Sequence, residues 1–427
     1  MTADKTIVSD LKARGLIYQS TDEKELAAHL SAPRTLYCGF DPTADSLHIG
    51  HLVPLLTLRR FQNAGHMPIA LVGGATGLIG DPSFKAEERK LNSDELVQRW
   101  TDKIRGQVSK FIDLDNARVV NNLDWIGGMT AISFLRDIGK HFSVNAMIRK
   151  DAVKTRLERE DVGISYTEFS YTLLQALDFA ELYNNHNCTV QLGGSDQWGN
   201  ITAGVDLTRR MHEGHVHALT VPLVTKADGT KFGKTESGAV WLDAEKTSPY
   251  AFYQFWLNTA DADVEKFLKY FTFISVNDID ALVAEHNQAP QNRLGQKRLA
   301  EEMTELVHDT EALKQAQHLT KVVFSTDANK WQRLSEADFK DLLQDGLPAT
   351  ELQEHEVPIL TALSTAGLAQ SNRQAREFID AGAVRVNDQP VPPKDYNHSL
   401  SPQTALFDKF TVLQVGKKKT HLLHWGS

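Results

Sequence analysis

Two histidines three residues apart directly follow a predicted strand. The segment 41–51 is DPTADSLHIGH, with Pro, Asp and Ser where a helix would begin. His48 and His51 would share one side of its first turn, and Gly50 would let a flat ring lie against the backbone. A helix N-terminus with two imidazoles suits a polyphosphate that gains charge in a transition state. The alternatives are two partly exposed histidines without a role, or a metal pair, which lacks the Glu of the H-E-x-x-H pattern.

A glycine-rich loop follows a second predicted strand. It covers residues 73–82, GGATGLIGDP, and it does not match the P-loop because no Gly-Lys-Ser/Thr follows. The loop could be only a tight turn between a strand and a helix. Asp81 at its end could bind an ammonium group, whereas Lys85 and Arg89 beyond it could reach phosphates or remain solvated surface.

A row of polar side chains occurs within a helical pattern. Tyr171, Gln175 and Asp178 are spaced by four and then three residues, which places them on one face of a helix. Leucines and a phenylalanine surround them, so the helix would pack into a core. Such a row is more often a solvated face, but a hydroxyl, an amide and a carboxylate could together bind a small polar ligand.

Two further segments combine glycine with polar or charged residues. Residues 191–197, QLGGSDQ, leave a strand and suit ribose hydroxyls and a carboxylate. Residues 231–235, KFGKT, place two lysines around a glycine, and such a loop can close over a triphosphate. As a bare pattern the second is common, and a surface loop is its ordinary meaning.

A parallel sheet would position these segments. Short apolar runs at 35–40, 67–73, 117–122 and 188–192 alternate with helical patterns at 94–114 and 171–183, as βαβ units do. Ligands bind beyond the carboxyl ends of such strands. Helical patterns follow at 250–258, 264–271, 277–286 and 293–318, then mixed short pieces at 322–358 and a small α+β tail from about 357. The fold class expected is α/β, with a helical region and an α+β module after it.

Composition excludes several classes of protein. The chain has 427 residues, 41% hydrophobic and 24% charged, which is ordinary for a globular protein and unlike a disordered or collagen-like chain. Cys38 and Cys188 are too few for a disulfide framework, and a reducing, cytoplasmic location is expected. We find no signal segment and no apolar run long enough to span a membrane.

Charge is distributed unevenly along the chain. The net charge is −9, but residues 357–427 contain eight Lys/Arg and five Asp/Glu, a balance of +3, which leaves −12 for the rest. An acidic body argues against a protein that coats nucleic acid over its whole surface. A basic terminal module on an acidic body is an asymmetry of the kind that interaction modules show, although small domains often differ in charge by this much.

In this order and spacing, the segments closely resemble bacterial tyrosyl-tRNA synthetases over nearly the whole chain. The sequence HIGH at 48–51 matches the first signature of class I synthetases, and KFGKT matches the second in the variant form that this family favours. The tail segments SNRQAR at 371–376 and VRVN at 384–387 resemble a small RNA-binding module shared with a ribosomal small-subunit protein. The resemblance implies a Rossmann-like catalytic domain, an α-helical domain and this α+β RNA-binding domain.

The resemblance also implies the reaction and its partners. The carboxylate of L-tyrosine would attack the α-phosphate of ATP, giving tyrosyl-adenylate and pyrophosphate, and tRNA(Tyr) would then accept the tyrosine at its 3′ end. Mg²⁺ would accompany ATP as its counter-ion, with no metal held by the protein alone. A homodimer is expected, with the interface around residues 125–160.

Residue roles come from the same resemblance. The expected catalytic residues are Thr43, His48, His51, Lys85, Arg89, Lys231, Lys234 and Thr235. The expected tyrosine-binding residues are Tyr37 and Asp178 at the phenol, Asp81, Tyr171 and Gln175 at the ammonium group, and Gln197 near the carboxylate. The expected ATP-binding residues are Cys38, Gly39, Asp41, Gly50, Gly194, Asp196 and Lys234.

The domain boundaries that we expect are 1–225 for the catalytic domain, 226–248 for a mobile catalytic loop region, 249–325 for the helical domain, 326–356 for a linker and 357–427 for the RNA-binding domain. Three rival functions remain at this point. They are a tryptophanyl-tRNA synthetase, a nucleotidyltransferase with a His-x-Gly-His site, and a non-enzymatic RNA-binding protein. A tryptophanyl-tRNA synthetase would have no use for the Tyr37/Asp178 pair, and a nucleotidyltransferase would have no use for the tail. A non-enzymatic RNA-binding protein would have no use for the two signatures.

Overall fold

The computed structural model describes residues 6–83, 92–150, 153–154, 157, 163–230, 232–235, 238–344, 346–416 and 419–426. The chain divides into two compact units. The first comprises Met1–Thr235 with Ala260–Gln288, and the second comprises Glu236–Thr259 with Ala289–Ser427.

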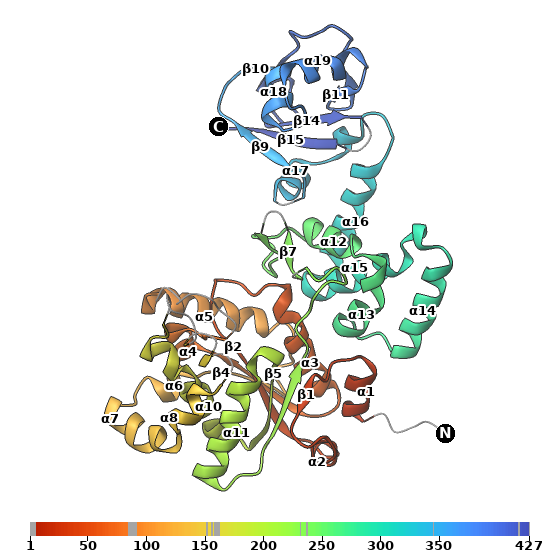
Figure 1. Ribbon diagram of the computed structural model, residues 1–427. Coiled ribbons are helices and arrows are strands. Elements are labelled where there is room, and N and C mark those ends of the chain that lie inside the picture. The colour runs from red at the N-terminus through yellow and green to blue at the C-terminus, as the bar shows by residue number, and fades with distance from the viewer. Residues whose placement is uncertain are drawn as a thin grey trace. The chain divides into compact units, whose positions relative to one another are not determined.

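The first unit is built on a six-stranded sheet with the order β1-β6-β5-β2-β3-β4 (Figure 1). Its strands are β1 Gln19–Ser20, β2 Thr35–Phe40, β3 Met67–Val72, β4 Arg118–Asn121, β5 Cys188–Gly194 and β6 His217–Val221. β1 pairs antiparallel with β6, and all other pairs are parallel. The predicted α/β class is confirmed, and β2 to β5 lie within two residues of their predicted ends. β1 and β6 are not among the predicted strands.

The strand order reverses between β2 and β5. From β2 the chain adds β3 and β4 on one side, and β5 and β6 later fill the other side. In open parallel sheets, the crevice beyond the carboxyl ends of the strands at such a reversal is where ligands bind. The segments that follow β2 and β5, residues 41–51 and 195–197, therefore border the crevice.

Helices on either side of these strands complete the first unit. They are α1 Ile7–Ala13, α2 Glu23–His29, η1 Ile49–His51, α3 Leu52–Asn63, α4 Gly74–Ile79, α5 Asp94–Val108, α6 Leu123–Ile126, α7 Ala131–Ser133, η2 Phe134–Ile138, η3 Gly139–His141, α8 Val144–Ile148, α10 Tyr166–His186, η4 Ser195–Gln197, α11 Trp198–His212, α13 Asp261–Phe271 and α14 Val276–Gln288. The short strand β7 Lys234–Thr235 ends the first segment of this unit.

Helix α10 is longer than the pattern at 171–183 predicts. The Ser165 hydroxyl caps its start by accepting the Glu168 backbone N–H, and Asn187 ends it in the left-handed conformation at φ 50°. The helix packs along α11 and against α4 and β5. It therefore carries the predicted polar row, which begins at Tyr171, into the core beneath the crevice.

The second unit has helices at its start and a five-stranded sheet towards its end. The helices are α12 Pro249–Leu257, η5 Pro290–Asn292, α15 Leu294–Val307, α16 Thr310–Phe324, η6 Lys330–Arg333, α17 Glu336–Leu343, α18 Ile359–Thr365, α19 Asn372–Asp380 and η7 Pro402–Thr404. The strands are β8 Gly238–Ala239, β9 Ala349–Leu352, β10 Val357–Pro358, β11 Val384–Val386, β12 Gln389–Pro390, β13 Ser399–Leu400, β14 Phe410–Val415 and β15 Lys419–Trp425. The sheet order is β12-β11-β14-β15-β9.

The helical pattern predicted at 293–318 is confirmed as helical, but the chain forms two helices there, α15 and α16. Asp309 separates them with φ 137°, a value that interrupts a helix. Its carboxylate then accepts the Ala312 N–H at 2.8 Å and caps α16. An aspartate in a long apolar-periodic stretch was the available signal for this break.

The two units divide the chain differently from the expected domains. Helices α13 and α14 belong to the first unit, whereas α12, α15 and α16 belong to the second. The segment expected as a linker, 326–356, contains α17 and also β9, which pairs in parallel with β15. Trp331 and Phe339 from this segment pack in one cluster with Phe410 and Leu422. Compact units need not be domains, so the predicted domain boundaries stay predictions.

Candidate active site

Asp178 lies at the closed end of the site, on the inner face of α10. Its side chain is 2% exposed, and it accepts hydrogen bonds from Asn122 Nδ2 at 3.1 Å and Trp125 Nε1 at 2.9 Å. Burial raises the pKa of the Asp178 carboxyl well above its ordinary value, and the two N–H donors oppose that rise. Each carboxylate oxygen keeps a lone pair for one more donor.

Tyr37 on β2 is the second buried group at this end. The residue is 1% exposed, and its ring lies 5.3 Å from the ring of Phe179 between centroids. Burial and the nearby Asp178 raise the pKa of the Tyr37 hydroxyl. Within the described part of the chain, this hydroxyl has no hydrogen-bond partner. A buried hydroxyl without a partner costs about 1–3 kcal/mol, a cost that a ligand pairing with it would remove.

A continuous hydrogen-bond network joins Asp178 to the loop after β2. Asn122 Nδ2 also donates to Thr76 Oγ1 at 3.1 Å, and the Thr76 hydroxyl donates to Asp41 Oδ1 at 2.6 Å. The Tyr171 hydroxyl donates to Asp41 Oδ2 at 2.6 Å. The predicted residues Asp41, Tyr171 and Asp178 are thus held in one network with two residues that the sequence patterns did not single out.

The Gln175 side chain lies one helical turn from Tyr171. Its Oε1 atom is buried and has no hydrogen-bond partner among the described residues. Near Tyr171 the carboxylates of Asp41, Asp81 and Asp178 all raise the pKa of its hydroxyl, after the larger effect of burial. This part of the site therefore has a hydrogen-bond acceptor without a donor, close to several carboxylates. Such surroundings favour a ligand with a cationic N–H donor, such as an ammonium group.

Asp81 and Gln197 meet across the mouth of the crevice. Gln197 Nε2 donates to Asp81 Oδ2 at 2.7 Å and to Asp196 Oδ2 at 3.0 Å. The Ser83 backbone N–H donates to the other Asp81 oxygen at 2.9 Å. Burial raises the pKa of Asp196. These predicted residues, from the glycine loop and from the end of β5, are brought together.

His48 and His51 form the open end of the site, in the turn η1 that leads into α3. Their ring centroids are 4.0 Å apart. His48 Nδ1 accepts the Gly50 N–H at 3.0 Å, and His51 Nδ1 accepts the His48 N–H at 3.2 Å. A Cβ on Gly50 would lie 2.8 Å from the His48 ring, so a larger residue would displace that ring.

The bonds at Nδ1 decide what the two rings can do. In a neutral ring whose Nδ1 is an acceptor, the proton is on Nε2. Burial, and next the neighbouring His48, lower the pKa of His51 to about 3, so this ring is neutral at pH 7. Both histidines then offer an Nε2–H donor. Thr43, with its backbone N–H bonded to the Asp41 carbonyl at 2.9 Å, is exposed next to them.

The second signature reaches the first at one glycine. Gly233 has φ +83°, a conformation that side chains disfavour, and a Cβ there would lie 3.0 Å from Ile49 Cγ1. KFGKT and HIGH are therefore neighbours although about 180 residues separate them. Lys85, Arg89 and Lys231 lie outside the described residues, and only the backbone of Lys234 and Thr235 is described.

The remaining predicted ATP residues lie along β2 and β5. Cys38 is buried and Gly39 is exposed beside it, and burial raises the pKa of the Cys38 thiol to about 12. A Cβ on Gly194 would lie 2.4 Å from Asp196 Oδ1, so a larger residue there would displace the Asp196 carboxylate.

Sequence patterns missed three residues of the site, namely Thr76, Asn122 and Trp125. Thr76 lies inside the glycine loop that was singled out, and Asn122 ends a predicted strand. Their polar character at those places was the available signal. Trp125, on α6, had no local signal, because its indole N–H matters only through Asp178.

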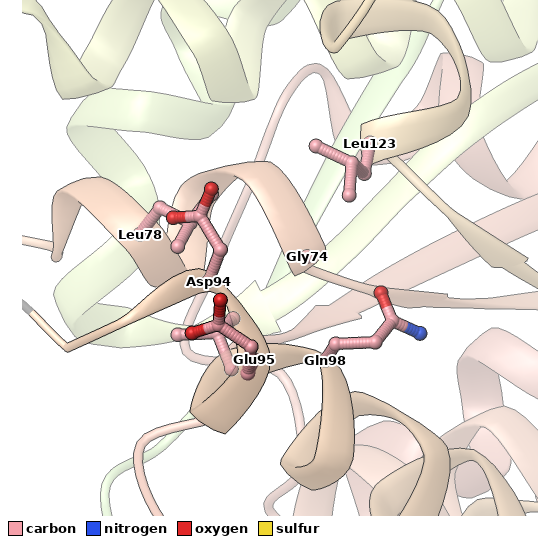
Figure 2. Close-up of a pocket in the computed structure, with 7 residues that line it drawn as sticks. Gly74, Leu78, Asp94, Glu95, Gln98 and Leu123 are labelled. Atoms are coloured by element: carbon pink, nitrogen blue, oxygen red, sulfur yellow. The ribbon is translucent and has the colours of Figure 1, made fainter.

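A separate cavity of about 330 Å³ lies between α4 and the start of α5 (Figure 2). It is lined by Gly74, Leu78, Asp94, Glu95, Val97, Gln98 and Leu123. None of the predicted site residues that the structure describes lines it.

The described residues also contain no group of three or more His, Cys, Asp or Glu side chains placed to hold a metal ion. Among the helices in the described ranges, none is long and apolar enough to cross a membrane.

Two family models match the chain. The model described as "tRNA synthetases class I (W and Y)" matches residues 30–325, and the model "Tyrosine–tRNA ligase SYY-like C-terminal domain" matches residues 338–423. The first covers the whole candidate site, and the second covers the basic tail.

Similar proteins extend over the full length. The tyrosine–tRNA ligase of Aliivibrio fischeri (strain MJ11) is 59% identical over 431 residues, covering 100% of both chains. That of Serratia proteamaculans (strain 568) is 56% identical over 428 residues, covering 99% of this chain and 100% of its own.

Solved structures show the same fold. A C-terminally truncated mitochondrial tyrosyl-tRNA synthetase from Aspergillus nidulans is 30% identical with a TM-score of 0.68, covering 75% of this chain and 94% of that one. A tryptophanyl-tRNA synthetase from Encephalitozoon cuniculi is 13% identical with a TM-score of 0.55, covering 79% and 92%, and supports the fold alone. The family predicted from the two signatures and the tail is confirmed: the chain belongs to the tyrosyl-tRNA synthetases of class I.

Proposed function

We propose that the chain activates L-tyrosine with ATP and transfers it to the 3′ end of tRNA(Tyr). One observation carries the choice of amino acid: the buried Tyr37 hydroxyl has no hydrogen-bond partner among the residues that the structure describes, and it lies near the Asp178 carboxylate. A tryptophan side chain offers only an N–H donor, whereas a phenol can donate and accept at once.

The phenol of the substrate would satisfy both groups at the closed end. Its O–H would donate a hydrogen bond to a remaining lone pair of Asp178, and its oxygen would accept a hydrogen bond from the Tyr37 hydroxyl. Phenylalanine would leave the Tyr37 hydroxyl unpaired and desolvated, which is the physical basis of discrimination at such a site.

The ammonium group of tyrosine would lie over the polar row. Gln175 Oε1, the oxygen of the Tyr171 hydroxyl and Asp81 are the acceptors that we assign to it. The Tyr171 hydroxyl already donates to Asp41, so its oxygen is oriented to accept. Gln197, beside Asp81, lies near the substrate carboxylate in this arrangement.

Phosphate chemistry belongs to the open end. The Nε2–H groups of His48 and His51, with Thr43, would donate to phosphate oxygens. Lys85, Arg89, Lys231 and Lys234 would offset the charge of the pyrophosphate as it leaves, and the Thr235 hydroxyl would donate a hydrogen bond to it. Cys38, Gly39, Asp41, Gly194 and Asp196 would lie near the ribose, and Gly50 under the adenine.

Both steps proceed by positioning and charge stabilisation. A tyrosine carboxylate oxygen bonds to the α-phosphorus, and the bond to pyrophosphate breaks. The terminal adenosine hydroxyl of the tRNA then attacks the tyrosyl carbonyl carbon, and AMP leaves with the bonding electrons. Mg²⁺ would enter bound to ATP and offset charge on its phosphates. The protein itself forms no covalent bond to the substrate.

The tail would bind the tRNA. Arg373 and Arg385 are exposed on α19 and β11, and Arg376 lies over the Tyr396 ring at 5.4 Å from its centroid. We expect Arg385→Ala to leave pyrophosphate exchange unchanged while weakening tRNA binding and lowering its salt slope by about 1. Unchanged tRNA binding at all salt concentrations would remove β11 from the interface.

A homodimer is proposed from an apolar surface of the first unit. Ile132, Leu135, Val144, Ile148 and Tyr166 are large, exposed and close in sequence, within or next to the expected 125–160 interface. Such clusters are typical of interaction sites. Sedimentation equilibrium should show a dimer for the native chain and a monomer for Ile132→Glu with Val144→Glu.

A cytoplasmic location is proposed as well, since tRNA charging serves cytoplasmic ribosomes in bacteria and both cysteines are free thiols.

ATP–pyrophosphate exchange over all twenty amino acids, without tRNA, tests the proposal. We expect exchange with tyrosine alone. Exchange with tryptophan, or none with any amino acid, would contradict the proposed substrate. Exchange with tyrosine but no charging of tRNA would contradict the second step only.

A further inference from the structure

Helix α13 holds the base of the loop that carries the second signature. The Ala227 N–H donates to Asp263 Oδ2 at 3.0 Å, and Lys266 Nζ donates to the Thr225 carbonyl at 2.7 Å. Lys266 Nζ also lies 2.8 Å from Asp263 Oδ1. One ion pair on α13 thus fixes two backbone groups that lie four and six residues before Lys231.

The same helix contacts the loop within the signature itself. The Phe232 ring stacks on Phe271 at 5.2 Å and 22°, and meets Phe267 nearly edge-on at 4.9 Å and 65°. Asp263, Phe267 and Phe271 are four residues apart, so they share one face of the helix. This face binds both the base and the body of the loop.

Helix α13 is in turn tied to the helix that follows the first signature. Arg60, in the last turn of α3, donates to the Thr272 carbonyl at the end of α13. Arg14 of the N-terminal region donates to the Ile274 carbonyl at 2.7 Å. Since α3 begins directly after His51, α3 and α13 form one frame that supports both signatures. The contact of Gly233 with Ile49 lies across this frame.

We propose that Asp263 and Lys266 are positioning residues for the catalytic loop. They touch no substrate; they restrict the backbone at 225–227 so that Phe232 and Gly233 keep their places and Lys234, next in the chain, can act on the phosphates. Asp263 is 2% exposed, so water does not compete for its bond to the Ala227 N–H. Releasing the loop restores its conformational freedom and displaces Lys234, and a displacement of about 1 Å can cost about 100-fold in rate.

The inference rests on the proposed phosphate role of Lys234, which has its own test. Adenylate formation, tyrosine affinity and transfer from preformed tyrosyl-adenylate to tRNA are measured on purified full-length variants. The variants are Lys266→Ala, Lys266→Arg, Asp263→Ala, Asp263→Asn, Lys234→Ala and the double variant Lys266→Ala with Lys234→Ala. Glu265→Ala is the matched control, because Glu265 lies on the same helix but pairs with Lys269 at the surface.

We expect Lys266→Ala and Asp263→Ala to slow adenylate formation about 10–100-fold, with tyrosine affinity and the transfer rate unchanged. Lys266→Arg and Asp263→Asn should recover part of the rate, since Arg can reach the Thr225 carbonyl and Asn can accept the Ala227 N–H. The double variant should be little slower than Lys234→Ala. Lys266 is partly exposed, with its side chain at 32%, so its replacement does not open the core.

Three results would overturn the inference. One is a normal rate of adenylate formation in Lys266→Ala and Asp263→Ala when Lys234→Ala is slow. Another is an equal loss of tyrosine affinity and transfer, which indicates general damage. The third is a double variant that multiplies the two single effects. A normal rate in Lys234→Ala would instead show that the proposed role of that lysine is wrong.

Discussion

The two ends of the proposed active site are built in opposite ways. At the tyrosine end, Asp178, Asn122 and Thr76 form a buried network in which the polar groups are already fixed. At the phosphate end, His48 and His51 lie in and beside a short turn, and Lys234, the one cation assigned to it whose backbone is described, lies in the two-residue strand β7. The difference indicates that substrate choice is set by the folded protein, whereas rate depends on contacts completed when ATP is present.

Burial explains why the ends must differ. A phenol can be selected only where water is absent, because water would satisfy Tyr37 and Asp178 whichever amino acid entered. Phosphates arrive hydrated and carry several charges, so their site must stay open until they are bound. Predictions that separate the two ends follow, from the largest expected effect to the smallest.

Asp178→Ala should damage both binding and folding. It removes the acceptor for the substrate phenol and leaves the buried donors of Asn122 and Trp125 unpaired, at about 1–3 kcal/mol each. We expect kcat/KM for tyrosine to fall about 1,000-fold and the free energy of unfolding to decrease. Denaturant unfolding and pyrophosphate exchange check this, with Glu181→Ala on the same helix as the control. Normal tyrosine affinity in the variant would place the phenol elsewhere.

Lys234→Ala should damage rate alone. A group that acts only in the transition state lowers kcat without changing substrate affinity, and such donors contribute about 100-fold. We expect slow adenylate formation with unchanged tyrosine affinity and unchanged thermal stability. Lys226→Ala in the same segment is the control. If the variant bound tyrosine more weakly but formed adenylate at the normal rate, Lys234 would act in substrate binding. The contrast drawn between the tyrosine end and the phosphate end would then be wrong.

Tyr37→Phe should lower the ratio of kcat/KM for tyrosine to kcat/KM for phenylalanine by about 10-fold, since a neutral hydrogen bond contributes about 0.5–1.5 kcal/mol. The free protein should be as stable as the native chain or more stable, because the hydroxyl removed is buried without a partner in the described structure. Pyrophosphate exchange with tyrosine and phenylalanine measures the ratio of kcat/KM, and Tyr183→Phe is the control. An unchanged ratio would show that Tyr37 does not bind the phenol.

Acidification should affect the tyrosine end first. The pKa of Asp178 is raised, so its carboxylate takes up a proton at a higher pH than a free aspartate, and tyrosine affinity should fall with it. His51, with its pKa lowered to about 3, stays neutral over the same range. Equilibrium dialysis of tyrosine from pH 7.5 to 4.5 should show a several-fold loss. A flat profile would contradict an ionised Asp178 as the acceptor.

Local patterns predicted the elements that depend on neighbours in sequence. The strand at 35–40 follows from a short apolar run and the polar row on α10 from helical spacing, which each segment carries in itself. The two signatures and the tail identified the family for the same reason. The helical pattern at 293–318 did not locate the break at Asp309, because apolar periodicity continues across it. Strand β6 was not predicted, because five residues with a histidine are a weak strand pattern.

The amino-acid sequence by itself determined the family, the α/β fold class and the residue types at the site. Only the tertiary structure decided which hydrogen-bond partners the polar groups of the site have. Trp125 and Asn122 meet Asp178 because α6 follows β4 and packs near α4 and α10, an arrangement set by strand order. Likewise, Asp263 holds Ala227 across 36 residues. Hydrogen bonds between distant segments leave no periodicity in sequence, because their geometry exists only after the core has packed.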